Sequence, residues 1–393
     1  MIPSDTLGWG IARNCIREVY EYGLRLKAEI GEEKVYDFSL GNPSVPAPPQ
    51  VKEAILKALE DPTLHDYTVA PGRPSLRKAI SDQLNARCGV NTEYTDIYVT
   101  CGASAAVTSS IRALTRTGEE VVALAPHYPE YPVFTHTAGG KFVVCSLRRE
   151  DLQLDEAALE AALTEKTAVV LVNSPNNPAG SVLTEDSLRR LAQVLHRAEQ
   201  KFGHPIFIVS DEPYRELVYD GKQVPSPISY YENTVVCYSY SKSLSLPGER
   251  IGYAAVSDRA AERENVFASI AGAARSYGYV NPPSLMQRVI ESCLNIAPDL
   301  ETYRANRDLL CGILDEANIS YIHPDGAFYL FIKSPIEDAK AFAEGARKFG
   351  ILLVPSNDFG ITGFVRAAYC VKGEMIARSR EAYQALAREY GLC

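Results

Sequence analysis

The chain has 393 residues, 46% hydrophobic and 23% charged, a composition that fits a globular protein large enough for more than one domain and excludes disordered and fibrous classes. Its 49 acidic and 40 basic residues give a net charge of −9, which argues against a nucleic-acid partner. The nine cysteines lack zinc-ligand spacing, and there is no signal-peptide pattern or membrane-length apolar run, so we expect a cytoplasmic protein with no metal and no membrane partner.

The first 40 residues have a helical pattern and lead into "LGNPSVPAPP", whose prolines predict a stiff crossing. From about residue 50 to 280, short runs rich in β-branched residues alternate with amphipathic helical patterns such as 103–116 and 184–202. The runs are 96–100, 120–125, 141–147, 167–173, 205–212 and 233–241. Strands that are apolar on both faces and alternate with helices predict a mostly parallel sheet covered by helices on both sides.

The next run, "RIGYAAV", begins at Arg250, only eight residues after Lys242. A parallel crossover needs about a dozen connecting residues or more, so this strand is predicted to run antiparallel to the one before it. Arg250 then returns to the same edge of the sheet as Lys242.

The C-terminal part has a different pattern, with a helix at 299–318, a strand "AFYLFI", a helix at 338–349, strands "ILLVP" and "GFVRAAYC", and a final helix. We therefore predict an α/β fold in which a large domain, 46–285, has a mostly parallel sheet of seven-stranded type. A smaller α+β domain, 286–393, is expected to pack with the N-terminal segment, 1–45.

Polar side chains follow three of the predicted strands at the points where those strands end. In open α/β sheets, ligands bind beyond the carboxyl ends of the strands, so these side chains are expected to converge on one site. They are Asn173 and Asn177, Asp211 and Tyr214, and Ser239, Ser241 and Lys242.

Another strand ends at "VTCGAS", where a helix starts at Ala103 and Ser104. Small residues and the free N–H groups of a first helical turn suit a phosphate, and Arg250 is placed to complete the cup.

A desolvated lysine can form a Schiff base with an aldehyde. An aldehyde that also carries a phosphate and a ring nitrogen in need of a carboxylate is pyridoxal phosphate, with Lys242 and Asp211 as its partners. Tyr214 and Asn177 are expected to hydrogen-bond the phenolate oxygen, and Tyr128 to stack on the ring.

At this point the sequence resembles the pyridoxal-phosphate-dependent aminotransferases of classes I and II, which have the fold type I architecture of aspartate aminotransferase. The motifs that carry the resemblance occur in the family's order over residues 41–370. They are "GNPSVPAPPQVKEAI", "YTVAPGRPSLRKAI", "TCGASAA", "PHYPEY", "NSPNNPAG", "DEPY", "SYSKSLSLPGERIGY" and "GFVRAAYC".

The resemblance implies a role for each matching residue. Lys242, Asp211 and Tyr214 are the implied catalytic residues, and Gly41, Asn177 and Arg366 the implied substrate-binding ones, with Arg366 forking onto the α-carboxylate. The implied cofactor-binding residues are Ala103, Ser104, Tyr128, Asn177, Asp211, Tyr214, Ser239, Ser241, Lys242, Arg250 and Tyr67. Tyr67 resembles the tyrosine that reaches the phosphate of the neighbouring subunit, which implies a homodimer.

The implied activity is transfer of the amino group of an L-amino acid, aspartate, aromatic or similar, to a 2-oxo acid such as 2-oxoglutarate by a ping-pong mechanism. A C–S β-lyase or related synthase on the same fold is the alternative, and a cofactor-binding regulator would need a DNA-binding domain that this acidic chain lacks.

Each of these residues also has an ordinary structural interpretation. Lys242 taken alone would be a solvated lysine in a serine-rich loop, and Asp211 would cap a turn. Arg366 would form an ion pair, and any one of the 23 tyrosines would be packing. Their convergence at strand ends favours the functional interpretation.

Overall fold

The larger part of the protein is built on a seven-stranded sheet. The computed structural model, which describes residues 3–12 and 14–392, orders its strands as β2 (Ile97–Thr100), β8 (Gly252–Val256), β7 (Thr234–Ser239), β6 (Phe207–Asp211), β5 (Thr167–Asn173), β3 (Glu120–Ala125) and β4 (Lys141–Ser146). Strand β8 is antiparallel to both of its neighbours, and the other pairs are parallel. The predicted fold class and the predicted reversal at "RIGYAAV" are both confirmed.

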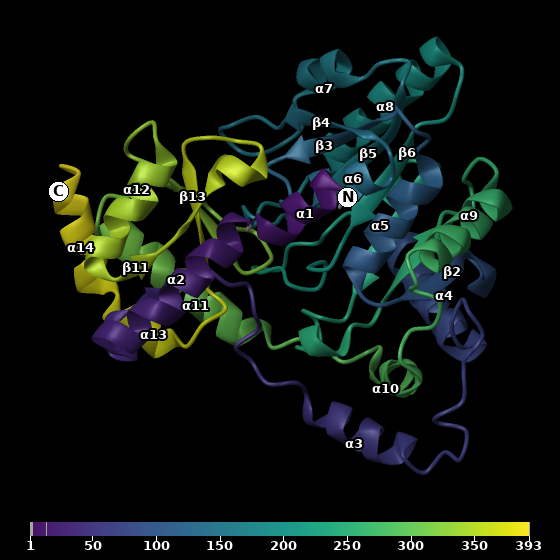
Figure 1. Cartoon of the computed structure of the whole chain (residues 1–393), viewed down its shortest axis with the longest axis horizontal. Coiled ribbons are helices and arrows are strands. Elements are labelled where there is room, and N and C mark those ends of the chain that lie inside the picture. The colour runs from purple at the N-terminus through teal and green to yellow at the C-terminus, as the bar shows by residue number, and fades with distance from the viewer. Residues whose placement is uncertain (1–2, 13, 393) are drawn as a thin grey trace.

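Helices cover both faces of this sheet because successive strand residues point to opposite sides. Val121 and Ala123 of β3 pack in one cluster with residues of α5 (Ala103–Leu114), α6 (Tyr131–Thr137) and α9 (Arg263–Ser276). Val122 and Leu124 pack in another cluster, which contains residues of α7 (Glu156–Ala162) and α8 (Glu185–Phe202). The two layers are visible on either side of the strands in Figure 1.

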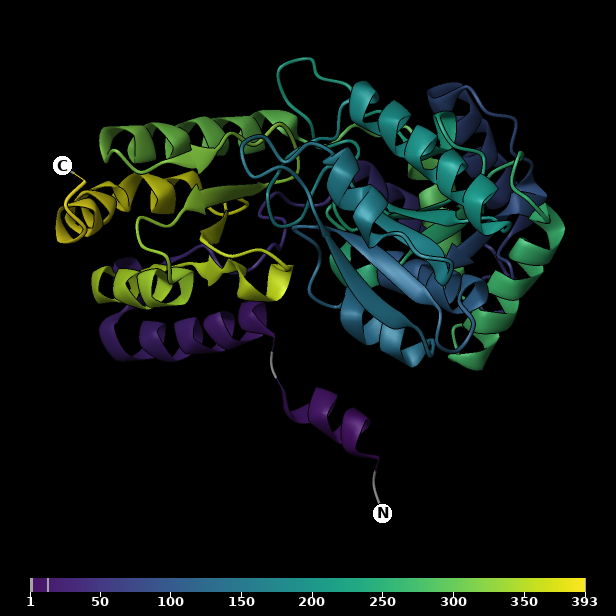
Figure 2. The same cartoon turned by 90° about the horizontal axis from the view of Figure 1, so that it is seen from above.

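A third cluster extends the core beside β2, β7 and β8. It contains residues of α3 (Pro49–Ala58), α4 (Pro74–Cys88) and α10 (Ser284–Cys293). Helix α1 (Ser4–Ile11) has no buried residue, and Figure 2 shows it at the periphery of the molecule. Its Trp9 and Asp5 contact His136 of α6. Among the described residues, no helix has the length and apolar character needed to cross a bilayer.

The smaller part has a four-stranded antiparallel sheet with the order β12 (Val354–Pro355), β13 (Phe364–Ala368), β10 (Tyr329–Lys333) and β9 (Tyr321–Ile322). Its helices are α11 (Leu300–Glu316), α12 (Ala339–Ala346), α13 (Gly373–Arg378) and α14 (Arg380–Glu389). The N-terminal segment joins it through α2 (Cys15–Ile30) and through β1 (Tyr36–Asp37), which pairs in parallel with β11 (Ile351–Leu352). Figure 1 shows α2 beside the C-terminal elements.

One predicted strand is divided in the structure. The run "ILLVP" forms β11 and β12 as separate strands because the first pairs with β1 and the second with β13. The domain boundaries at residues 45 and 285 stay predictions.

Candidate active site

A cavity of about 310 Å³ lies at the carboxyl ends of β5, β6 and β7 and is also lined by residues of the smaller part. It brings together all but one of the predicted site residues. Those lining it are Gly41, Ala103, Ser104, Tyr128, Asn177, Asp211, Tyr214, Ser239, Ser241, Lys242, Arg250 and Arg366. The convergence expected from the strand ends is therefore present in the structure.

Lys242 lies in the turn that follows β7, with its amine directed across the cavity. Its Nζ donates a hydrogen bond to the carbonyl oxygen of Gly41 at 2.8 Å. Burial lowers the pKa of Lys242 from its ordinary value of 10.5 to about 8. Near neutral pH the unprotonated amine is therefore a minor form, but it is far more populated than in an ordinary lysine, and it is the form that attacks a carbonyl.

Asp211 ends β6 as a buried carboxylate with one oxygen satisfied and one not. Its Oδ2 accepts a hydrogen bond from the Tyr131 hydroxyl at 2.6 Å, whereas its Oδ1 is buried without a partner. Burial raises the pKa of Asp211 to about 7, although the Tyr131 hydrogen bond opposes the shift. A buried carboxylate with an orphaned oxygen is suited to a cationic or proton-bearing ligand group.

Asn173 joins Asp211 to the loop that carries Asn177. Its Nδ2 donates to the Asp211 carbonyl oxygen at 2.8 Å, and its Oδ1 accepts from the Asn177 backbone N–H at 2.8 Å. The first bond joins the ends of β5 and β6, and the second joins the end of β5 to the loop, so Asn173 positions Asp211 and Asn177 relative to each other.

The start of α5 and Arg250 form the opposite end of the cavity. Gly102 precedes the helix with φ 86°, and a Cβ atom there would lie 2.7 Å from Nη2 of Arg250. Arg250 itself is a non-glycine residue with φ 51°, a left-handed conformation that costs backbone energy. The first-turn N–H groups at Ala103 and Ser104 complete an anion-binding cradle.

Arg366 lies on β13, in the smaller part, and is 1% exposed. Its Nη1 donates to Asn177 Oδ1 at 3.0 Å, its Nη2 donates to the Ser39 carbonyl oxygen, and its Nε is buried without a partner. A guanidinium held by neutral acceptors, with a donor to spare, suits a carboxylate ligand.

Tyr214 and Tyr329 form a pair beside this arginine. Their hydroxyl oxygens are 2.9 Å apart, and the Arg366 guanidinium lies 4.6 Å from the Tyr329 ring centroid. The Tyr329 hydroxyl also explains the glycine at position 41, because a Cβ atom on Gly41 would lie 2.0 Å from it.

Tyr67 is the one predicted site residue that lies outside the cavity. It is 96% exposed and lines a separate pocket with Arg73 and Arg288. Its predicted role in a neighbouring subunit stays a prediction.

Sequence reasoning missed several residues of the site. Tyr131 stands in the quoted motif "PHYPEY", so its spacing from Tyr128 was a usable signal. Tyr329, Ile16 and Leu40 line the cavity without any motif that sets them apart from core residues.

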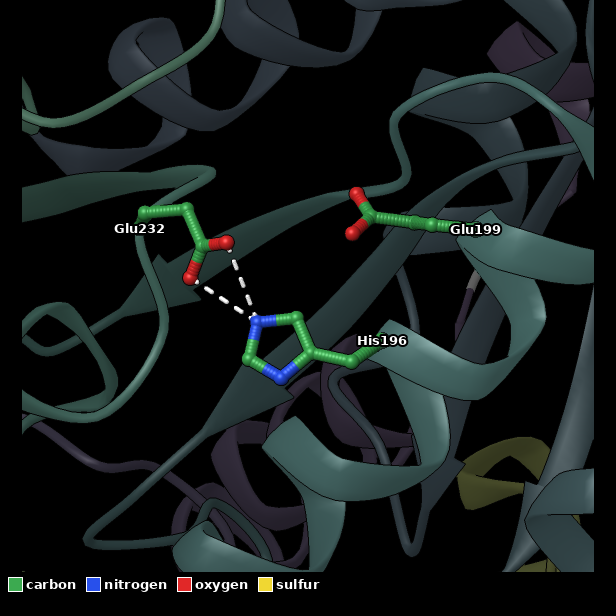
Figure 3. A group of neighbouring side chains, drawn as sticks. All are labelled: His196, Glu199 and Glu232. Atoms are coloured by element: carbon green, nitrogen blue, oxygen red, sulfur yellow. Dashed lines mark hydrogen bonds and ion pairs between the residues drawn. The ribbon is translucent and has the colours of Figure 1, made fainter.

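A second polar group lies at the opposite ends of the same strands, next to the start of β6 and β7. Figure 3 shows His196 and Glu199 of α8 converging with Glu232. His196 Nε2 lies 2.9 Å from a Glu232 carboxylate oxygen, and Glu199 Oε1 accepts from the Ile206 N–H at 2.9 Å and from Asn233 Nδ2 at 2.8 Å. Each side chain already has a protein partner, so we assign this group a structural role.

Residues 33–382 match the family described as "Aminotransferase class I and II". A probable aspartate/prephenate aminotransferase of Thermus aquaticus is 31% identical over 354 residues, covering 87% of this chain and 89% of the relative. A probable aspartate aminotransferase of Methanocaldococcus jannaschii is 29% identical, covering 94% and 96%.

Solved structures with the same fold include an amino transferase from Eubacterium rectale. It superimposes with a TM-score of 0.97 at 43% identity, and 99% of each chain is covered. The aspartate aminotransferase of Thermus thermophilus, solved with maleate, superimposes with a TM-score of 0.87 at 26% identity. The match covers 98% of this chain and 100% of the Thermus thermophilus chain.

Proposed function

Because the chain belongs to the class I and II aminotransferases and is a transaminase, we propose that it transfers the amino group of an L-amino acid to a 2-oxo acid in two half-reactions at one site. Aspartate and aromatic amino acids are the proposed donors, and 2-oxoglutarate is the acceptor that the family suggests. The observation that carries the proposal is the convergence of Lys242, Asp211 and Arg366 in one cavity.

The family uses pyridoxal phosphate, and we propose that this cavity holds it. When bound, that group supplies the carbonyl that accepts the amino group and an electron-withdrawing ring. The orphaned Oδ1 of Asp211 supports this assignment, because it is the kind of acceptor that a protonated ring nitrogen needs. The cradle at Gly102 and Arg250 supports it as well, because a phosphate needs close backbone approach.

Other lining residues have proposed tasks that follow from their positions. Asn177 and Tyr214 offer hydrogen-bonding groups for the phenolate oxygen, and Tyr128 offers a ring face for stacking. Ser239 and Ser241, at the end of β7, are proposed to bind the phosphate with Arg250.

Arg366 is the proposed anchor for the substrate's α-carboxylate. The carboxylate would replace Asn177 Oδ1 and the Ser39 carbonyl oxygen as an acceptor of the Arg366 guanidinium. It would also accept a hydrogen bond from Nε, which has no partner. This contact fixes the α-carbon relative to Lys242, so that the bond to be broken is held in one orientation.

Lys242 is proposed to remove the proton from the substrate's α-carbon and to return it to the carbon atom that carried the cofactor's carbonyl. A pKa of about 8 makes it a base of suitable strength near neutral pH and, once protonated, an acid of suitable strength for the return step.

We also propose a homodimer in which Tyr67 serves the neighbouring site, on the basis of its 96% exposure and of the motif around it. The cytoplasmic location stays a prediction. The C–S β-lyase alternative is not favoured, since the relatives are named as aminotransferases.

The proposal is tested by adding an amino donor alone to the cofactor-loaded enzyme. The bound cofactor should lose its absorbance in the visible range as the donor becomes a 2-oxo acid, and a 2-oxo acid should restore it. Lys242→Ala should lower this rate by about 10²- to 10⁴-fold, the usual contribution of a positioned acid–base. Release of ammonia and pyruvate from cystathionine, without need of an acceptor, would contradict transamination.

A further inference from the structure

A group of charged and hydroxyl side chains lies beside the cavity and has no task in the proposed function. Tyr214 and Lys242 line the cavity. Arg215 and Ser243, the residues that follow them in the sequence, are 1% and 6% exposed and are not among the described residues that line it. The members of this group, the Arg215 group, are Arg215, Glu216, Tyr238, Ser243 and Tyr253.

Arg215 brings a buried positive charge into the group, and its neighbours hold it in place. Its Nε donates a hydrogen bond to Glu216 Oε1 at 2.8 Å, and its Nη1 donates to the Tyr253 hydroxyl at 2.7 Å. The guanidinium carbon lies 3.8 Å from the centroid of the Tyr238 ring, which is a cation–π contact. An arginine is always protonated in proteins, so this is a buried charge with a carboxylate partner and an aromatic one.

The second carboxylate oxygen of Glu216 connects this pair to the turn that carries Lys242. Glu216 Oε2 accepts a hydrogen bond from the Tyr238 hydroxyl at 2.9 Å, and the same hydroxyl lies 2.8 Å from Ser243 Oγ. Since the Tyr238 proton is used on the carboxylate, the Ser243 hydroxyl is the donor in the second bond. A continuous series of hydrogen bonds therefore joins Arg215 to Ser243.

The turn that carries Lys242 has a long backbone hydrogen bond across it. The Leu244 N–H donates to the Tyr240 carbonyl oxygen at 3.3 Å, beyond the usual range of about 2.7–3.2 Å. The Lys242 amine stands at the end of a flexible four-carbon chain, so its position depends on how well the turn is held. The bond from Ser243 to Tyr238 supplies a second hold on this turn.

We propose that Tyr238 is a positioning residue of the transaminase, which holds the turn of Lys242 in a fixed place relative to the loop that follows β6. The inference rests on the proposed function, in which Lys242 transfers the proton. Tyr238 is not among the described residues that line the cavity, and it acts through Ser243, with the Arg215–Glu216 pair as its anchor. Arg215 and Tyr238 are each 1% exposed within a single subunit, so a neighbouring subunit is not needed to complete their contacts.

The test measures the first half-reaction of the full-length, cofactor-loaded enzyme and of Tyr238→Phe, followed by the absorbance of the bound cofactor. Phenylalanine keeps the ring beside the Arg215 guanidinium and removes only the hydroxyl. The donor is L-aspartate or L-phenylalanine at saturation, whichever the wild type uses faster. The rate constant is expected to fall about 10- to 100-fold, since a misplacement of 1 Å can cost as much as the larger factor.

A donor deuterated at its α-carbon provides the readout that a loss of stability alone would not change. If Lys242 is displaced, proton transfer becomes the slow step, so deuteration should slow Tyr238→Phe by a larger factor than it slows the wild type. A wild-type rate constant, or a lower one with an unchanged isotope effect, overturns the inference.

Tyr231→Phe is the matched control. Tyr231 is 0% exposed, and its hydroxyl donates to the Ile206 carbonyl oxygen at 2.7 Å, just before the amino end of β6. This variant also loses a buried hydroxyl and its hydrogen bond, so its urea midpoint should fall. Its rate constant and isotope effect should equal those of the wild type, and a loss of rate equal to that of Tyr238→Phe overturns the inference.

Ser243→Ala removes the Tyr238 bond from its other end. If this bond holds the turn, the single variants should both be slower than the wild type, and the double variant should be about as slow as the slower of the two. Losses that multiply in the double variant overturn the inference and leave the transaminase proposal intact. A wild-type enzyme whose cofactor absorbance changes with neither donor overturns the proposed function and this inference with it.

Discussion

The two ends of strands β6 and β7 differ in how their polar side chains are satisfied. In the cavity at the carboxyl ends, Asp211 Oδ1 and Nε of Arg366, which comes from β13, are buried without partners. At the amino ends, Glu199 accepts two hydrogen bonds and His196 pairs with Glu232. Both groups contain titratable side chains brought together by the same sheet.

The difference separates a ligand site from a structural one. A buried polar group without a partner costs the folded protein free energy, and in the cavity a ligand can supply the missing bond to Asp211 and to Arg366. A saturated group stabilises the chain and has little left to offer a ligand. Substitutions at four residues test this distinction, two of them lining the cavity and two in the group of His196, Glu199 and Glu232.

Asp211→Asn is expected to have the largest effect and to act in opposite directions on activity and on stability. It keeps an acceptor for Tyr131 and removes the negative charge, so activity should fall by about 10²- to 10⁴-fold, as for loss of an acid–base partner. The measurement is the steady-state rate at saturating cofactor.

The stability of the cofactor-free protein should move the other way. The pKa of Asp211 rises from 3.8 to about 7, so the folded state binds its proton more tightly, and stability is lost as pH rises through this window. Well above pH 7 that loss is complete, on the order of 4 kcal/mol at 1.36 kcal/mol per pKa unit. Urea unfolding should find the variant more stable than the wild type at pH 8 and nearly equal to it at pH 4. A variant that is less stable at pH 8 would contradict the unsatisfied state of Asp211.

Arg366→Lys is expected to have the next largest effect on activity. Lysine keeps the charge but loses the fork that matches a carboxylate, so kcat/KM should fall by about 10- to 100-fold. Cofactor affinity, measured by titration of absorbance, should stay within about two-fold. Equal losses in both quantities would show that Arg366 supports the fold of the site and does not bind the substrate.

The contrast between the two ends could be predicted from the sequence only in part. Strand ends and motif order predicted the convergence of Asp211, Asn177 and Lys242, because the direction of parallel strands fixes which ends meet. Arg250 followed from the length of its connection, a physical limit that needs no structure.

The rest depends on contacts between distant segments. Ile16 and Leu40 look like ordinary core residues, and only the packing of the N-terminal segment against both parts brings them to the cavity. The group at His196, Glu199 and Glu232 has no motif either, since it joins a helix to a residue more than thirty positions away. Local patterns predict which edge of a sheet is functional, but they do not predict which residues from distant segments complete the lining of the cavity.

Glu199→Ala should affect stability and leave activity nearly unchanged. It strands the N–H of Ile206, a residue with 0% exposure, and removes a partner of Asn233, at a cost of about 1–3 kcal/mol in the free energy of unfolding. The urea midpoint should fall while kcat of the folded enzyme stays within about two-fold. Glu199→Gln keeps an acceptor oxygen and is expected to recover part of the lost stability.

His196→Ala should have the smallest effect because its pair with Glu232 is half-exposed. The pKa of Glu232 lies below its ordinary value of 4.5. Burial acts to raise this pKa, but the hydrogen bond and the charge of His196 are among the interactions that lower it by more. The pair therefore contributes stability above that pH and loses it as the pH falls through the lowered pKa. Exposed pairs contribute about 0.2–1 kcal/mol, so the urea midpoint at pH 7 should shift only slightly.

Added Zn²⁺ should not raise the melting temperature of the wild type more than that of His196→Ala, because Glu199 already has protein partners. A rise specific to the wild type would make this end of the sheet a metal site and would remove the distinction between saturated and unsatisfied groups.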